Sequence, residues 1–147
     1  MSSNNPVVVV QGRAPYEVIM TSGLYEFTAD EPQEMGGGDL GPNPYQYLLL
    51  ALGSCTAITL RLYAERKGYT LTDLKITLTH EKLENRQDKI TRHIQIDGDF
   101  DDVAVARFLD IAAKCPVART LLNSVALEQQ IESPKSPLEL RAQGKKG

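Results

Sequence analysis

The feature that most constrains the fold is an apolar run near the middle of the chain. No charged residue occurs from Leu40 to Leu60, and the strongly apolar part runs from Leu48 to Leu60. A membrane-spanning helix needs roughly 18–20 apolar residues, so this run is too short to span a bilayer. A helix that is apolar nearly all round is buried on every side. We therefore expect a core helix with other elements wrapped around it.

Local signals mark both ends of this helix. Asn43 is a good N-cap, and Pro44 suits the first helical position. Gly68 suits the left-handed stop after a last helical residue at about Lys67. Glycine inside a helix costs about 1 kcal/mol relative to alanine, so Gly53 predicts that another side chain packs closely there.

The rest of the chain reads as short strands and two shorter helices. Turn signals around Gly12, Pro15 and Gly23 separate three short predicted strands at Val7–Val10, Tyr16–Met20 and Leu24–Thr28. Alternating apolar and polar residues predict further strands at residues 74–79, residues 90–97 and Val125–Ile131. Asp101 or Asp102 caps a helix that ends near Cys115, and Pro116 starts a second helix that runs to about Asn123. This order predicts an α+β fold with helices packed on antiparallel sheet. We expect one domain over residues 1–132 and a partly disordered tail over residues 133–147.

Composition excludes several classes of function. The formal net charge of −3 provides no electrostatic attraction to nucleic acid or to an anionic membrane. The first residues lack the positively charged region of a secretion signal, so we expect a cytoplasmic protein. The three consecutive glycines from Gly36 are not followed by the Gly-Lys-Ser/Thr of a phosphate-binding loop.

Two cysteines in a reducing compartment leave two interpretations, which are buried small apolar residues or a redox pair. Cys55 lies inside the apolar helix, where burial alone makes a thiol inert unless a cation stabilises its thiolate. Cys115 directly precedes Pro116 at the start of a helix, and Arg119 lies one turn further on. Helix N-termini lower thiol pKa values, so local physics nominates Cys115 as the more acidic thiol.

The residues around both cysteines resemble one known family. The matching runs are Ala29–Pro32, Gly36-Gly37, Gly41–Tyr45, Leu48–Ala57, Thr59-Leu60, Tyr63–Lys67, Ile111-Ala112, Lys114–Val117 and Arg119–Leu121. Together they are similar to the OsmC/Ohr family of peroxidases, over roughly residues 7–131. Two separated cysteine motifs in the right order make the resemblance specific.

The resemblance implies an intertwined homodimer, with the cysteine-bearing helices at its centre and active sites at the subunit interface. It implies that Cys55 attacks an organic or fatty-acid hydroperoxide and that Cys115 resolves the resulting sulfenic acid to a disulfide. It also implies an arginine from the N-terminal strands beside the thiolate, for which Arg13 is the candidate. The expected reductant is a dithiol such as a lipoyl group, and no flavin, haem or metal cofactor is expected.

The chain departs from the family pattern where a carboxylate is expected to hold the arginine. Tyr45 stands at the usual glutamate position and Gln46 at the next, while Ala118 replaces the usual histidine after Cys-Pro-Val. Gln46 offers a neutral hydrogen bond, which is weaker than a charge-assisted pair. Glu31 is interpreted as a turn residue that can also contact the arginine.

Two hypotheses of different class therefore stay open. The first is a thiol-dependent hydroperoxide reductase that uses Cys55 and Cys115. The second is an OsmC-like dimeric ligand-binding or interaction module whose peroxidase activity is weakened or lost. His80 is interpreted as a partnered core or interface histidine and His93 as a solvated one. Two cysteines and two histidines without ligand spacing do not predict a zinc site.

Overall fold

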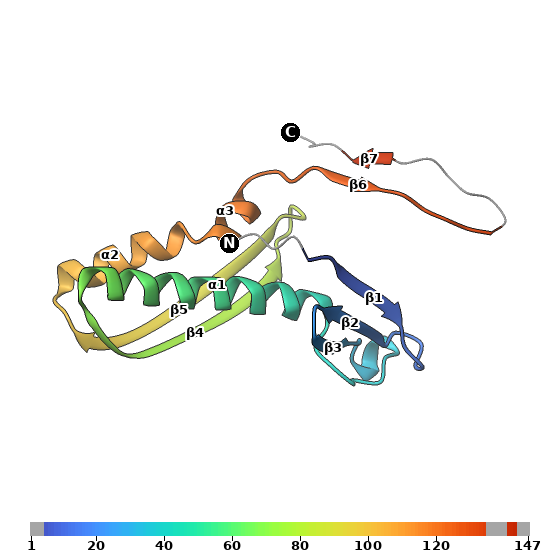
Figure 1. Cartoon of the computed structure of the whole chain (residues 1–147), viewed down its shortest axis with the longest axis horizontal. Helices are drawn as coiled ribbons and strands as arrows, with labels where there is room; N and C mark the ends of the chain where they lie inside the picture. Colours follow the sequence, from blue (N-terminus) through green and yellow to red (C-terminus); the bar gives the residue numbers. More distant parts are fainter. Residues whose placement is uncertain (1–4, 135–140, 144–147) are drawn as a thin grey trace.

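The computed structural model describes residues 5–134 and 141–143, and these form an α+β fold as predicted (Figure 1). Its antiparallel strands form three separate sheets. The elements, in chain order, are β1 (Val7–Gln11), β2 (Val18–Ser22), β3 (Tyr25–Ala29), the 3-10 helix η1 (Gln33–Met35), α1 (Pro44–Lys67), β4 (Thr70–Lys82), β5 (Asp88–Asp99), α2 (Asp102–Ala113), α3 (Pro116–Leu122), β6 (Leu127–Gln129) and β7 (Arg141–Gln143).

The bounds of α1 confirm the prediction from its capping residues. The side chain of Asn43 accepts a hydrogen bond of 2.9 Å from the backbone N–H of Gln46, and the Gln46 side chain accepts one of 2.8 Å from the backbone N–H of Asn43. This reciprocal pair is a capping box. At the other end Gly68 adopts φ 72°, the left-handed conformation that glycine adopts without strain.

Several other bounds differ from the sequence prediction, and β4 and β5 both extend beyond the predicted residues 74–79 and 90–97. β2 begins at Val18 rather than at Tyr16, because the chain still turns there, with Gly12 N–H donating to the carbonyl of Glu17. β6 is shorter than expected, with only residues 127–129 in the strand. The predicted tail contains β7, which pairs antiparallel with β6, and the other tail residues beyond 134 lie outside the described part of the chain.

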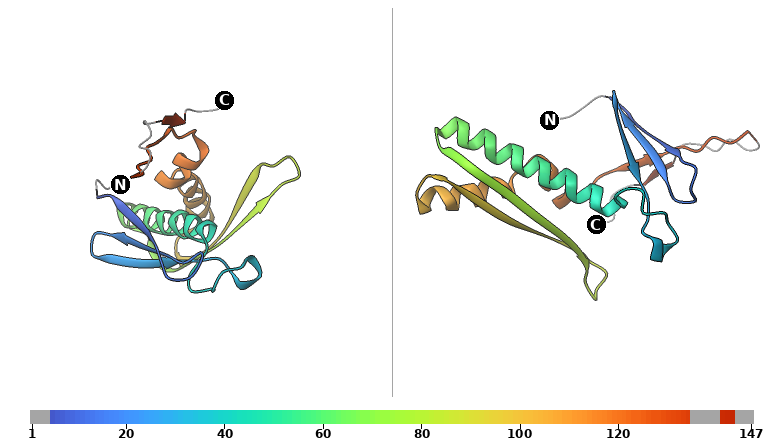
Figure 2. Two further views of the ribbon diagram at one scale, coloured as in Figure 1. Left: turned by 90° about the vertical axis from the view of Figure 1, so that its right-hand side faces the viewer. Right: turned by 90° about the horizontal axis from the view of Figure 1, so that it is seen from below.

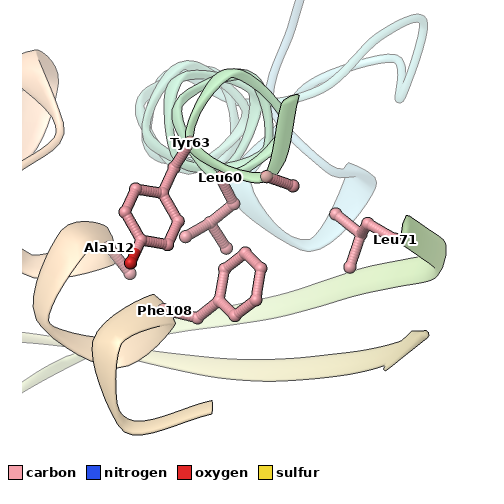
Figure 3. Close-up of a cluster of buried hydrophobic side chains, with 6 residues drawn as sticks. Leu60, Tyr63, Leu71, Phe108 and Ala112 are labelled. Carbon is pink, nitrogen blue, oxygen red and sulfur yellow. The ribbon is translucent and has the colours of Figure 1, made fainter. Parts of the chain in front are cut away.

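The core lies between α1, the β4–β5 hairpin and α2. The hairpin pairs Leu74 with Ile96 and Ile76 with Ile94, so it presents alternate apolar side chains on one face. Figure 3 shows the packed cluster, whose ring contacts include an edge-on pair of Tyr63 and Phe108 with centroids 5.3 Å apart. Its buried members are Leu60, Tyr63, Ala64, Leu71, Phe108 and Ala112.

The three-stranded sheet lies at the N-terminal end of α1, and the β6–β7 ribbon extends away from the rest of the chain (Figures 1 and 2). The Tyr47 hydroxyl of α1 donates to the carbonyl of Thr28 on β3. The buried carboxylate of Asp30 accepts hydrogen bonds from the backbone N–H groups of Glu31, Gly38 and Leu40. The segment from Glu31 to Leu40, called the glycine loop below, therefore folds around the carboxylate of Asp30, and these bonds fix the path of the chain into α1.

The expectation that α1 is buried on every side is not met within one chain. Leu50, Ile58 and Leu62 are each at least half exposed, while Leu52, Cys55 and Leu60 are buried. By length and composition α1 is the one described helix apolar enough to span a bilayer. It packs on β4, α2 and α3 as a core helix.

Candidate active site

The two cysteines meet in one buried cluster. Cys55 comes from the middle of α1, and Cys115 is the N-cap residue of α3. Their cluster is closed by Leu52 on α1 and Ala118 on α3. Both thiols are free, with Cys55 7% exposed and Cys115 fully buried. The chain thus brings together the two thiols that the sequence nominated.

Close packing next to the thiols explains the glycine at position 53. A Cβ atom placed on Gly53 would lie 2.8 Å from Cδ1 of Leu78 on β4. Leu78 in turn packs against the thiol cluster. The missing side chain lets α1 approach the hairpin at the turn that carries Cys55, as the sequence predicted.

Arg92 on β5 is the cation beside the thiols, and the sequence analysis did not nominate it. Its Nη1 lies 3.9 Å from the sulfur of Cys115 and donates hydrogen bonds to Oγ1 of Thr56, 3.0 Å away, and to the carbonyl of Ala112, 2.9 Å away. A signal for it exists in the sequence. Arg92 occupies the inward phase of its strand, between Ile90 and Ile94, where an apolar residue is expected.

Thr56 completes the polar contacts of the buried sulfur. Its Oγ1 lies 3.5 Å from the sulfur of Cys115 and donates a hydrogen bond of 2.7 Å to the carbonyl of Leu52. Burial raises the pKa of the Cys115 thiol, but the hydrogen bond with Thr56, the backbone N–H of Ala118, the thiol of Cys55 and the charge of Arg92 together bring that pKa below its ordinary value. The amide of Ala118 lowers the pKa of Cys115 although it forms no full capping hydrogen bond to the sulfur. Local physics had nominated this thiol as the more acidic one.

The other predicted site residues lie away from the thiols. Arg13 is exposed, and its backbone N–H donates a hydrogen bond to the carboxylate of Glu17, 2.8 Å away. Glu31 lies in the glycine loop, where its carbonyl accepts from the N–H of Asp39. Among the described residues, no hydrogen bond or ion pair joins the side chain of Arg13 or Glu31 to the thiol cluster.

Gln46 and Tyr45 have other partners. The side-chain oxygen of Gln46 is taken up by the capping box, and its side chain lines a groove of about 640 Å³ between α1 and β4. Tyr45 stacks on His80 with ring centroids 4.4 Å apart, and Nε2 of His80 lies 2.7 Å from a carboxylate oxygen of Asp88. His80 is therefore a partnered histidine, as interpreted from the sequence.

A pocket of about 420 Å³ adjoins the thiol cluster. Arg92, Leu52 and Ala118 belong both to its wall and to the surroundings of the thiols. Most of the remaining wall is apolar, with one polar edge. The other lining residues are Tyr45, Leu48, His80, Asp88, Ile90, Leu121 and Leu122. Among the described residues no group of acidic, cysteine and histidine side chains could hold a metal ion.

Comparison with known proteins finds one matching family. Residues 36–130 match a family model described as OsmC-like protein. Protein YhfA of Escherichia coli K12 is 32% identical over 101 residues, which cover 65% of this chain and 75% of that protein.

Solved structures share the fold. An OsmC-like protein from Mycoplasma pneumoniae superimposes with a TM-score of 0.71 at 22% identity, covering 83% of this chain and 89% of that one. A Legionella pneumophila protein described as an organic hydroperoxide resistance protein superimposes with a TM-score of 0.62 at 21% identity, covering 81% and 89%.

Proposed function

This chain belongs to the OsmC-like protein family, and from that premise we propose that it is a thiol-dependent peroxidase that reduces organic or fatty-acid hydroperoxides. The observation that carries the proposal is the meeting of Cys55 and Cys115 as free thiols in one cluster beside a cation. The family and its hydroperoxide-resistance neighbours support a redox role of this kind.

In the proposed cycle the thiolate of Cys55 attacks the outer oxygen of the hydroperoxide. The O–O bond breaks, the alcohol leaves with a proton, and the sulfur is oxidised to a sulfenic acid. Cys115 then condenses with the sulfenic acid, which forms the disulfide and releases water. A dithiol of the lipoyl type reduces the disulfide and returns both thiols, so the cycle needs no metal, haem or flavin.

The pocket beside the thiols supports an organic substrate. Its leucine-rich wall favours an alkyl or acyl chain, because burying apolar surface stabilises a complex by about 25 cal/mol per Å². Hydrogen peroxide gains nothing from such a wall. We therefore propose a preference for cumene or fatty-acid hydroperoxide over hydrogen peroxide. Free buried thiols also fit the reducing cytoplasm, where we place the protein.

A second candidate is a dimeric ligand-binding module with weakened peroxidase activity. Its specific support is that neither Tyr45 nor Gln46 supplies the carboxylate of the family pattern, because Tyr45 stacks on His80 and the oxygen of Gln46 caps α1. Gln46→Glu tests this point, because glutamate keeps the capping box and adds a charge. A rise in peroxidase rate in this variant supports a cycle limited by the missing carboxylate.

The deciding experiment measures peroxide consumption with cumene hydroperoxide and with hydrogen peroxide, each with dihydrolipoamide or dithiothreitol as reductant. Cys55→Ser should abolish turnover. Cys115→Ser should reduce one equivalent and stop at a sulfenic acid on Cys55, which a dimedone-type probe traps. A wild-type protein that consumes no peroxide, with a ligand bound in the 420 Å³ pocket, would establish the second candidate instead.

A further inference from the structure

The two thiols differ in their polar surroundings. The sulfur of Cys115 has Arg92 at 3.9 Å and Thr56 at 3.5 Å. Among the described residues, neither an arginine nor a hydroxyl donates to the sulfur of Cys55. Arg92 therefore lies beside Cys115, the resolving cysteine by the family resemblance, rather than beside the nucleophile Cys55.

Arg92 and Thr56 are held in place by backbone groups of two helices. Nη1 of Arg92 donates to the carbonyl of Ala112 in the last turn of α2, where a cation also favours the helix dipole. Thr56 is anchored to its own helix through the carbonyl of Leu52. The contact of Arg92 with Ala112 does not involve the sulfur, so the cation is held in place before any charge forms on Cys115.

The threonine hydroxyl can serve either state of the sulfur because it has one proton and two lone pairs. Beside a neutral thiol, the hydroxyl of Thr56 donates to Leu52 and its oxygen accepts from the S–H of Cys115. Beside a thiolate, the hydroxyl proton turns to the sulfur, and Arg92 supplies a second donor with a full charge.

We propose that Arg92 and Thr56 hold Cys115 as a thiolate, so that Cys115 is the attacking sulfur when the disulfide forms and the leaving sulfur when it is reduced. The inference rests on the proposed peroxidase cycle and assigns residues to its second and third steps. The acidity of Cys115 and the peroxidatic role of Cys55 are then compatible, because they belong to different steps.

The electrons balance in both steps. The thiolate of Cys115 attacks the sulfur of the Cys55 sulfenic acid, the S–O bond breaks, and hydroxide leaves and takes up a proton to become water. In the reverse direction a thiolate of the dithiol reductant attacks the sulfur of Cys55, and the S–S bond breaks with its electron pair on Cys115. The second thiol of the reductant then attacks its own mixed-disulfide sulfur and releases Cys55.

Access and acidity both favour attack on Cys55. Its side chain is 7% exposed, whereas Cys115 is fully buried. The better leaving group in thiol–disulfide exchange is the thiol with the lower pKa. A reductant should therefore form its mixed disulfide with Cys55 and leave Cys115 free.

The first test uses the wild-type protein, oxidised to the disulfide with diamide, freed of excess diamide, mixed briefly with glutathione and then quenched with excess N-ethylmaleimide, which traps the thiols that are free at that moment. Peptide mass spectrometry should find glutathione on Cys55 and maleimide on Cys115. The reverse labelling would overturn the proposal. Because diamide replaces the peroxide, this result stands or falls independently of the peroxidase activity.

The second test measures the acidity of Cys115 alone in the Cys55→Ser background, where thiolate absorbance at about 240 nm reports a single cysteine. Thr56→Val and Arg92→Met should each move the titration to higher pH, while Thr56→Ser and Arg92→Lys should retain most of the wild-type value. Thr59→Val and Arg61→Met are matched controls on α1. Thr59 has a buried hydroxyl without a partner among the described residues, and Arg61 donates to the carbonyl of Leu71 instead of to a sulfur.

The third test separates the steps in otherwise wild-type protein by rapid mixing with cumene hydroperoxide. For Arg92→Met, sulfenic acid formation on Cys55 should stay within about twofold of the wild type. Disulfide formation should slow by roughly threefold for each unit of rise in the Cys115 pKa, because a loss of thiolate is partly offset by higher nucleophilicity. A slower first step with an unchanged second step would assign Arg92 to Cys55 and overturn the inference.

Discussion

The guanidinium of Arg92 on β5 lies 3.9 Å from the sulfur of Cys115, although the two residues are 23 positions apart in the chain. The charge lies beside a sulfur that no solvent reaches. Water screens such a pair far less than an exposed one, so the contact affects protonation and stability together.

The first prediction is a pH dependence of stability. Burial raises the Cys115 pKa, but Thr56, Ala118, Cys55 and Arg92 lower it below its ordinary value of 9.0. A pKa that is lower in the folded state adds stability that is fully present above the unfolded pKa and is lost as the pH falls through the folded pKa. Urea unfolding of Cys55→Ser and of Cys55→Ser/Cys115→Ser should therefore diverge as the pH rises towards about 9. A constant difference across that range would contradict the lowered pKa.

The second prediction concerns the close approach of α1 to β4. Gly53→Ala gains about 1 kcal/mol of helix propensity. Its new Cβ atom would lie 2.8 Å from Cδ1 of Leu78, which forces that side chain to move. Overpacking costs about 1–3 kcal/mol, so we expect a net loss of about 1 kcal/mol in the free energy of unfolding. Leu78→Val removes the clashing atom, so the double variant should lose less than the sum of the single losses. Additive losses in this cycle would show that the contact is not tight.

The third prediction concerns the glycine loop before α1. Asp30→Ala leaves three backbone N–H groups without their acceptor and should lower the free energy of unfolding by about 3 kcal/mol. Asp30→Asn keeps one of the two oxygens and should lose less. Chemical denaturation measures both. Glu34→Ala is the control, since Glu34 is acidic and exposed in the same loop and has no such contacts.

The fourth prediction is a homodimer. The exposed side chains of Leu50, Ile58 and Leu62 on α1 leave an apolar face for a second copy to cover. The β6–β7 ribbon also projects away from the rest of the chain (Figure 2). Obligate interfaces bury more than about 2,000 Å². Light scattering should give twice the mass of one chain for the wild type. The double variant Leu50→Glu/Ile58→Glu should shift the measured mass towards that of a single chain. Val103→Glu, at an exposed apolar position on α2, is the control. A stable wild-type monomer at micromolar concentration would contradict the proposed assembly.

The fifth prediction concerns Arg13, which has no side-chain contact with the thiols in one chain. If Arg13 serves the Cys55 of a partner, Arg13→Ala should slow sulfenic acid formation. Refolding Arg13→Ala together with Cys55→Ser should restore about one quarter of the wild-type rate, because random pairing makes half of the dimers mixed and each has one complete site. No recovery beyond the residual Arg13→Ala rate would exclude action across the interface.

Local signals in the sequence predicted most of the fold elements and nominated the two thiols that the fold brings together. The ends of α1 depend on Asn43, Gln46 and Gly68, which act on backbone groups no more than four positions away. Such contacts depend only on residues close in the chain, so spacing alone predicts them. The cysteine motifs likewise identified the family that the comparisons found.

Only the tertiary structure decided what surrounds the thiols. Arg92 on β5, Thr56 on α1 and Cys115 before α3 come from three elements, and their distances depend on how those elements pack. Packing places side chains that are remote in sequence, and no local spacing encodes it. A local trace of these polar surroundings is Arg92 itself, a charged residue in the inward phase of an apolar strand, which requires a buried partner to offset the cost of its desolvation.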